Sequence, residues 1–139
     1  MDAWSGYEAS RLRLLNSFAQ TRTVNPVVVS GDSHASWACD MKLDFRNVNT
    51  PAVGTEFAGT SISSDGDGAD LPGSVATQLL DNPQVKFYNG KRGYVRCVLT
   101  SGRFQADYRG VDRVSVPGSY VSTKASYVVE NGRPGAQRF

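Results

Sequence analysis

The chain has 139 residues, 40% of them hydrophobic, and its 15 Lys and Arg against 13 Asp and Glu give a net charge of +2. This length suits one domain or a piece of one, with enough apolar residues to bury a core. The interspersed charges form no basic block or zinc-finger pattern, which argues against nucleic-acid binding, and no apolar run approaches the roughly 18 residues that span a bilayer.

The amino-terminal segment is predicted to form a helix. Ser5 and Glu8 have the spacing of a capping box. Apolar side chains recur at three- and four-residue steps, on one helical face, at Leu12, Leu15, Phe18 and Ala19. Arg22 and Asn25-Pro26 are expected to end the helix. The residues before Phe18 lack the continuous apolar core of a secretory signal.

Two strands are expected next. Val27–Val29 is β-branched and suits a buried strand. Cys39–Phe45 alternates apolar and polar residues, which is typical of a half-exposed strand and would leave Asp40 and Asp44 as solvent-exposed charges. A helix, a buried strand and an amphipathic strand in this order indicate an α/β fold.

The middle of the chain is predicted to be largely loop. Thr50–Gly73 is rich in Gly, Ser and Asp, with a possible short strand at Glu56–Ile62. A loop this long inside a compact domain is usually functional or disordered. A short helical turn is expected at Ser74–Leu80.

The remainder is predicted to be β-structure. Val85–Tyr88 and Tyr94–Thr100 flank Asn89-Gly90, a typical hairpin turn. Two further strands are expected at Phe104–Tyr108 and Ala125–Val129. The polar tail, Glu130–Phe139, is expected to fray.

The two cysteines, Cys39 and Cys97, lie far apart in the sequence and lack the spacing of a metal motif. Two free, buried thiols are expected rather than a disulfide. Their number leaves the redox compartment open.

Candidate metal ligands follow the valine strand. Asp32 offers a hard oxygen, and His34, the only histidine of the chain, offers a nitrogen. In extended backbone their spacing of two residues would point both side chains the same way. A lone histidine is more often a hydrogen-bonded structural residue than a ligand.

The same turn also has the Gly-Asp-Ser sequence of the GDS hydrolases, in which the serine is a nucleophile. Ser33 would then need a histidine base within hydrogen-bonding reach. Because His34 is its immediate neighbour, extended backbone would point the two side chains to opposite faces. The sequence therefore argues against a nucleophilic serine here.

Asp65–Asp70 is acidic and glycine-rich, like a calcium loop. The helix–loop–helix pattern fails, because Asp70 stands where a glycine is needed and Ala76 where a bidentate glutamate is needed. A solvated, flexible acidic loop is expected instead.

Glu56 lies within Val53–Ser64, a segment of small residues and hydroxyls. Such a segment could let backbone and hydroxyl groups approach an anion or a metal shell. A plain Gly/Ser-rich loop fits the spacing equally well.

Five blocks of residues occur in the order found in a known family: Trp4–Tyr7, Asn25–Trp37, Glu56–Ser64, Asn82–Phe87 and Arg92–Tyr94. Over residues 2–135 the chain resembles the carboxyl-terminal half of the PhoD-like alkaline phosphatases. The resemblance implies an α/β fold, with residues 1–139 as the carboxyl-terminal portion of a metallophosphatase-type two-sheet sandwich flanked by helices. Within it, an amino-terminal helix is followed mostly by β-strands.

The resemblance also implies a metal-dependent hydrolase of phosphomonoesters or phosphodiesters, with calcium and iron as its metals. Asp32 would be a metal ligand, and His34 a ligand or a catalytic phosphate contact. Glu56 and Ser61 would support the site from the neighbouring loop. Clustered cations neutralise phosphate charge, activate a bound water and stabilise the developing charge.

Family members take most of their metal ligands from an amino-terminal half that has no counterpart in this sequence. The isolated chain is therefore expected to be weak or inactive and to need that half, or a partner chain, along its open strand edges. The resemblance implies a periplasmic or extracellular location. The alternative function is a non-catalytic α/β interaction module that pairs through an open sheet edge.

Overall fold

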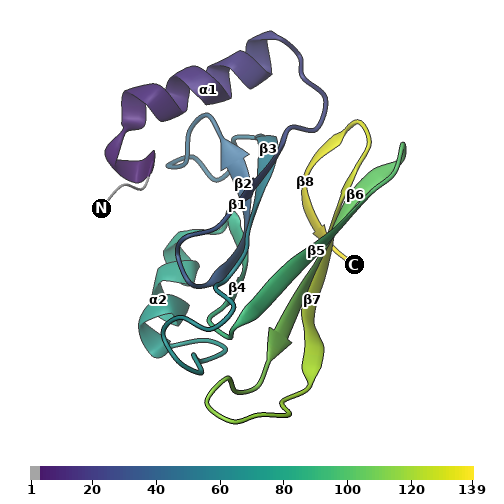
Figure 1. The fold of residues 1–139 in the computed structure, drawn as a ribbon. Helices are drawn as coiled ribbons and strands as arrows, with labels where there is room; N and C mark the ends of the chain where they lie inside the picture. The colour runs from purple at the N-terminus through teal and green to yellow at the C-terminus, as the bar shows by residue number, and fades with distance from the viewer. Residues whose placement is uncertain (1–3) are drawn as a thin grey trace.

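The computed structural model describes residues 4–139 and shows an α/β fold in which two four-stranded sheets face each other (Figure 1). Residues 2 and 3, where the family resemblance begins, lie outside the described residues. The elements are η1 (Trp4–Gly6), α1 (Glu8–Gln20), β1 (Val27–Ser30), β2 (Ser36–Lys42), β3 (Ala52–Ala58), α2 (Gly73–Asp81), β4 (Val85–Asn89), β5 (Gly93–Leu99), β6 (Arg103–Val111), β7 (Val121–Glu130) and β8 (Arg133–Arg138).

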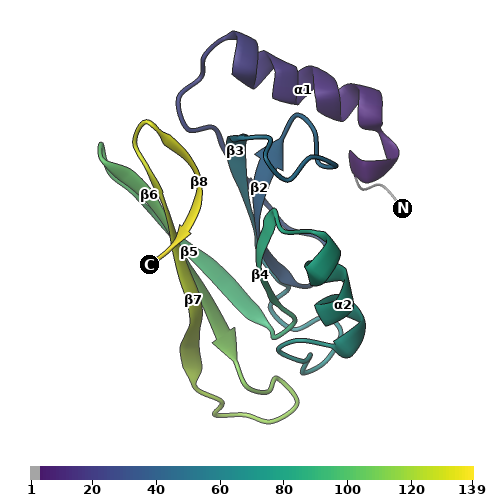
Figure 2. The same cartoon turned by 180° about the vertical axis from the view of Figure 1, so that it is seen from behind.

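The first four strands form sheet A, in the order β1-β3-β2-β4. β1 pairs parallel with β3, whereas β2 is antiparallel to both β3 and β4. Helix α1 lies across one end of this sheet, and α2 lies beside β4 (Figures 1 and 2). Because β1, β3 and β4 all run in one direction, their carboxyl ends meet at the same edge.

Sheet B is an antiparallel meander of β5, β6, β7 and β8. The hairpin predicted at Asn89-Gly90 is wrong, because β4 pairs with β2 in sheet A and β5 pairs with β6 in sheet B. The turn sequence is present, but each flanking segment pairs with a strand other than its hairpin neighbour, β4 with β2 and β5 with β6. The chain therefore crosses between the two sheets at Gly90–Arg92.

Aromatic side chains fill the space between the sheets. Phe57 on β3 is fully buried and stacks on Phe104 of β6, with ring centroids 5.6 Å apart. The hydroxyl of Tyr108 donates to the carbonyl of Trp37, and burial raises the pKa of this phenol. The core thus combines apolar packing with a hydrogen bond that joins the two sheets.

The segment predicted to be mostly loop contains a central strand. β3 covers Ala52–Ala58, whereas only a short strand at Glu56–Ile62 was expected. A small residue is needed at Gly54 for close packing: a Cβ there would lie 2.9 Å from the backbone carbonyl oxygen of Pro26. The glycine therefore reflects the approach of neighbouring groups and not a turn.

Burial on sheet A also differs from the prediction. β1 is an edge strand, and Val29 is 61% exposed, so the expected burial of the valine strand is wrong in this chain. β2 begins at Ser36, earlier than predicted, and turns Ala38 and Asp40 inward. Asp40 is therefore buried rather than exposed, while Asp44 is exposed as expected.

The carboxyl-terminal tail does not fray; it forms β8 and pairs with β7. The backbone N–H of Ala136 donates to Oδ1 of Asp40 at 2.8 Å, and Nζ of Lys86 lies 3.3 Å from Oδ2. These contacts offset the free-energy cost of burying the carboxylate of Asp40. The tail is thus part of the inter-sheet packing.

Both helices form where the sequence predicts them. Leu15 is the buried side chain of α1, and α2, at Gly73–Asp81, includes the helical turn predicted at Ser74–Leu80. The prediction of a capping box is wrong. Ser5 lies in η1, and the N-cap of α1 is Tyr7, which makes no side-chain capping hydrogen bond.

Both cysteines are free, as expected, but only Cys39 is partly buried, and Cys97 is exposed. Burial, together with the nearby charges of Glu56 and Asp40, raises the pKa of Cys39 to about 12. Cys39 is therefore a protonated, inert thiol at neutral pH.

A buried carboxylate stabilises the middle of sheet B. Asp107 is 3% exposed, and its oxygens accept hydrogen bonds from Gln105 at 2.9 Å, Ser126 at 2.7 Å and Arg96 at 2.6 Å. Desolvation alone would raise its pKa, but these hydrogen bonds outweigh it and hold the pKa of Asp107 below the ordinary value.

Asp107→Asn is expected to lower the free energy of unfolding at pH 7 by about 1–3 kcal/mol, because an amide N–H₂ cannot accept the bonds that Arg96 and its neighbours donate. A carboxyl group with a lowered folded-state pKa stabilises the fold above the unfolded pKa, near 4, and the effect disappears as pH falls through the folded value. Urea unfolding should therefore show a difference that closes below about pH 4. The exposed Asp112, changed to Asn, is the control and should shift stability by about 0.5 kcal/mol or less. Equal losses in both variants would contradict the role of Asp107.

Candidate functional site

Three loops meet where β1, β3 and β4 end. They comprise residues 31–35, 59–72 and 90–92. Backbone hydrogen bonds join them: the N–H of Gly59 donates to Ser30, that of Gly90 to Ala69, and that of Gly93 to Ser61, at 2.9–3.0 Å. We call this region the carboxyl edge. In sheets of this kind, ligands bind beyond the carboxyl ends of the strands.

His34 lies in the first of these loops and contacts the second. Its Nδ1 is 2.7 Å from Oδ2 of Asp65, and the two side chains are 41% and 71% exposed. The contact leaves Nε2 of His34 as the ring nitrogen available to a ligand. Asp65 had been assigned to a solvated acidic loop, and no local pattern marked it as the partner of a histidine 31 residues away.

The backbone of this region is not extended, as the sequence analysis had assumed. Asp32, His34 and Asp65 have φ angles of 71°, 50° and 67°, in the left-handed region. Such angles are uncommon outside glycine, although Asp and His tolerate them better than most, and they cluster at functional sites. The expected parallel projection of Asp32 and His34 therefore loses its basis, since it required an extended chain.

Ser33 makes a local hydrogen bond instead of contacting the histidine. Its hydroxyl donates to the carbonyl of Ala35 at 3.1 Å, and the backbone N–H of Ser33 donates to Gly31. The ring nitrogen Nδ1 of His34 is engaged by Asp65. Ser33 is therefore not activated by His34, in agreement with the sequence analysis.

Arg92 fastens the second loop to the crossing between the sheets. Its side chain is 3% exposed, and Nη1 donates to Oγ of Ser61 at 2.9 Å and to the carbonyl of Ser64. Nη2 donates to the carbonyl of Gly90. Ser61, predicted to support the site, therefore lies at the carboxyl edge, with its hydroxyl bonded to Arg92.

Further bonds hold the acidic part of this loop, which had been expected to be flexible. Asp67 accepts from the backbone N–H groups of Val114 and Ser115 at 2.7 and 2.9 Å, and Asp70 accepts from Nδ2 of Asn89 at 2.8 Å. Hydrogen bonds from Ser115 and Val114 hold the pKa of Asp67 below its usual value. The loop is thus tied to both sheets.

Glu56 lies within β3, in agreement with the possible strand at Glu56–Ile62 and not with the alternative of a plain loop. Its Oε1 accepts a hydrogen bond from Oγ of Ser30 at 2.6 Å, and its cross-strand neighbour is Cys39. Glu56 is therefore linked to the last residue of β1, next to the carboxyl edge, but its support of a metal site stays a prediction.

Asp32 and His34 have side chains of the chemical types that bind metal ions. Asp32 and His34 supply oxygen and nitrogen, of which calcium accepts the former and iron both. A carboxylate on the second ring nitrogen is the usual arrangement around metal-binding histidines. Among residues 4–139, however, no group of three or more His, Cys, Asp or Glu side chains could hold a metal ion. This portion of the chain could contribute ligands but does not by itself complete a site.

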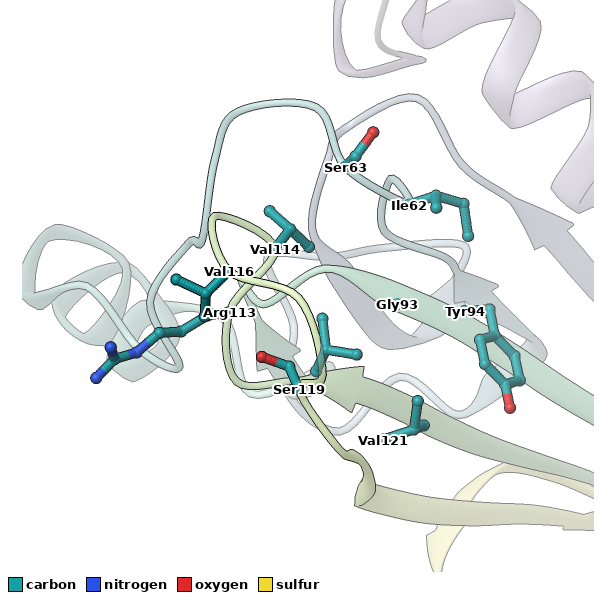
Figure 3. Close-up of a pocket in the computed structure, with 10 residues that line it drawn as sticks. Ile62, Ser63, Gly93, Tyr94, Arg113, Val114, Val116, Ser119 and Val121 are labelled. Atoms are coloured by element: carbon teal, nitrogen blue, oxygen red, sulfur yellow. The ribbon is translucent and has the colours of Figure 1, made fainter.

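A shallow apolar hollow of about 390 Å³ adjoins the carboxyl edge. Ile62 of the second loop and Tyr94 of β5 line it together with Val116 and Val121 (Figure 3). Arg113 also lines it, with its guanidinium pointing outward (Figure 3). The hollow is continuous with the loop that Arg92 anchors, since Ile62 follows Ser61 directly.

The partly parallel sheet, with a carboxylate-bound histidine among the loops at its carboxyl edge, places the chain in the α/β class. Comparison with known families is more specific: the PhoD-like phosphatase model matches residues 1–108, and the chain belongs to this family. The resemblance found in the sequence is thereby confirmed.

Comparison with two relatives shows what share of a family member this chain covers. Alkaline phosphatase D of Bacillus subtilis (strain 168) is 42% identical over 138 residues, which are 99% of this chain and 24% of that protein. The solved structure of PhoD matches with a TM-score of 0.90 and 41% identity, over 99% of this chain and 26% of that one. The chain thus spans about a quarter of the length of these relatives.

The described part of the chain, residues 4–139, contains no helix that is long and apolar enough to cross a membrane. The periplasmic or extracellular location implied by the family resemblance stays a prediction.

Proposed function

We propose that this chain is part of a metal-dependent phosphoester hydrolase and contributes Asp32 and His34 to its metal and phosphate site. The observation that carries the proposal is the carboxyl edge, where three strand ends gather and His34 is bonded to a carboxylate through Nδ1. Membership of the PhoD-like phosphatase family supports the reaction class.

Each residue has a distinct part in this proposal. Nε2 of His34 binds a metal ion or a phosphate oxygen, and the exposed carboxylate of Asp32 binds a metal ion. Arg92 keeps the loop that carries Asp65 against the sheet crossing. When bound, calcium and iron, the metals implied by the resemblance, neutralise phosphate charge and activate water near neutral pH.

The rest of the site must come from outside this chain. A cluster of two or three metals needs more protein donors than Asp32 and His34. The edge strands β1 and β5 also leave apolar side chains uncovered, with Val29 61% and Leu99 76% exposed. We infer that these edges pair with polypeptide equivalent to the amino-terminal part of the relatives, and that the isolated chain is weak or inactive.

Hydrolysis of an aryl phosphate, with calcium and iron present, tests the proposal. The chain is assayed alone and after co-expression with the amino-terminal three-quarters of a PhoD-like relative, and activity is expected only in the complex. Asp32→Asn should lower kcat at least about 100-fold, equal to about 3 kcal/mol of transition-state stabilisation, and reduce the bound metal. Asp44→Asn, at an exposed carboxylate, is the matched control and should leave both unchanged.

Two results would contradict the proposal. Turnover by the chain alone at enzyme-like rates would show that no further polypeptide is needed. An unchanged metal content in the Asp32→Asn complex would remove Asp32 from the ligand set.

A second candidate function is a non-catalytic module that pairs with another chain through an open sheet edge. It is favoured by the exposed apolar residues on the edge strand β5, Val98 and Leu99, which are 43% and 76% exposed. Such pairing would be insensitive to a chelator and to Asp32→Asn. Measuring the size of the complex with and without chelator separates the two functions.

A further inference from the structure

We propose that Asp65 is a positioning residue, whose carboxylate fixes the imidazole of His34 as the tautomer protonated on Nδ1. In this form Nε2 carries the lone pair and would be the ring nitrogen that binds a metal ion or a phosphate. The inference rests on the proposed function for the role of Nε2, whereas the tautomer itself can be measured without it.

The chemistry of the contact determines the direction of the hydrogen bond. Nδ1 of His34 lies 2.7 Å from Oδ2 of Asp65. An ionised carboxylate accepts hydrogen bonds and donates none, so Nδ1 must carry the proton. The bond made by one ring nitrogen sets the state of the other, and in the neutral ring Nε2 is then unprotonated.

Stability does not explain this arrangement. The side chains of His34 and Asp65 are 41% and 71% exposed, and ion pairs of such exposure contribute little to folding. Both residues nevertheless have left-handed backbone, with φ angles of 50° and 67°, which is unfavourable for residues with a Cβ. The backbone conformation of the two residues is unfavourable, and their ion pair adds little to the stability of the fold. The position that the pair gives the imidazole explains the arrangement better.

The position of Asp65 is fixed from both sides. Arg92 donates to the carbonyl of Ser64, directly before Asp65. The N–H of Gly90 donates to the carbonyl of Ala69 at 3.0 Å, four residues after it. These anchors connect the carboxylate to the sheet crossing, so that it can orient the imidazole.

The lone histidine makes the tautomer directly measurable. Nitrogen-15 NMR of the metal-free, 139-residue chain, with the imidazole in its neutral form, reports which ring nitrogen is protonated. The wild type is expected to be mainly Nδ1-protonated. Asp65→Ala should lower the ratio of the Nδ1–H to the Nε2–H form about five-fold, equivalent to about 1 kcal/mol.

Two variants separate positioning from general loop structure. Asp65→Asn keeps an oxygen acceptor and should restore the wild-type tautomer. Asp70→Ala removes a carboxylate from the same loop that bonds Asn89 and not His34, and should leave the tautomer unchanged.

A wild-type ring protonated mainly on Nε2 would overturn the inference, whether or not any variant folds. An unchanged ratio in a folded Asp65→Ala chain would do the same. Failure of the proposed function is recognised separately: His34→Gln would then leave turnover of the reconstituted complex unchanged, while the tautomer of the metal-free chain would still depend on Asp65.

Discussion

Gly68→Ala is expected to lower the free energy of unfolding by about 3 kcal/mol or more, whereas Gly66→Ala should cost only about 1 kcal/mol. The two glycines have nearly the same backbone conformation, with φ angles of +65° and +64°. A Cβ on Gly68 would lie 1.8 Å from the carbonyl oxygen of Gly90, while a Cβ on Gly66 would meet nothing within 4 Å. The difference between the variants therefore isolates the steric clash from the strain of left-handed backbone.

Urea unfolding of both variants, measured side by side with the wild type, gives the comparison. The clash must push the loop after β3 away from the crossing at Gly90–Arg92, so Gly68→Ala should also disturb the His34–Asp65 contact. Equal losses of stability at the two glycines would show that the loop does not pack against the crossing.

Phe57→Ala is expected to lower the free energy of unfolding by about 3–5 kcal/mol, because it opens a cavity between the sheets. Phe57 is fully buried and stacks on Phe104. The loss is large against the 5–15 kcal/mol typical of whole domains. Chemical denaturation, followed by near-ultraviolet circular dichroism, measures the change.

Phe139→Ala removes the same atoms from a ring that is 66% exposed and lies 4.8 Å from the guanidinium of Arg103. Its cost should not exceed about 1 kcal/mol. If Phe57→Ala does not fold, Phe57→Leu, with an expected loss of about 1.5 kcal/mol, provides the measurement. A cost at Phe57 no greater than at Phe139 would contradict the placement of Phe57 in the core.

Local sequence patterns predicted the elements whose conformation depends mainly on residues close in the sequence. The apolar period of α1, the β-branched run of β1 and the break at Asn25-Pro26 all agree with the observed elements. Position relative to other strands could not be predicted in the same way. β3 has a Gly/Ala-rich sequence because it lies at the crowded centre of sheet A, and such a sequence alone resembles a loop.

Of the two residues at the centre of the candidate site, His34 and Asp65, only His34 could be predicted from the sequence. His34 is marked by its place directly after a strand and by being the only histidine. Asp65 carries no such mark, because it reaches His34 through the return of a loop that Arg92, itself 27 residues further on, holds in place. Contacts that depend on three separate loops are set by the tertiary fold, and neither periodicity nor spacing reports them.

The bond between the N–H of Ala136 and Asp40 has a consequence for the order of events during synthesis. Asp40 belongs to β2, which leaves the ribosome early, whereas its partner is made 96 residues later. Until then Lys86 is the only one of its two partners to have been made, and burying the carboxylate without the backbone donor is costly. Sheet A can therefore assemble its strands on the nascent chain, but we expect its inner face to close only after β8 has emerged.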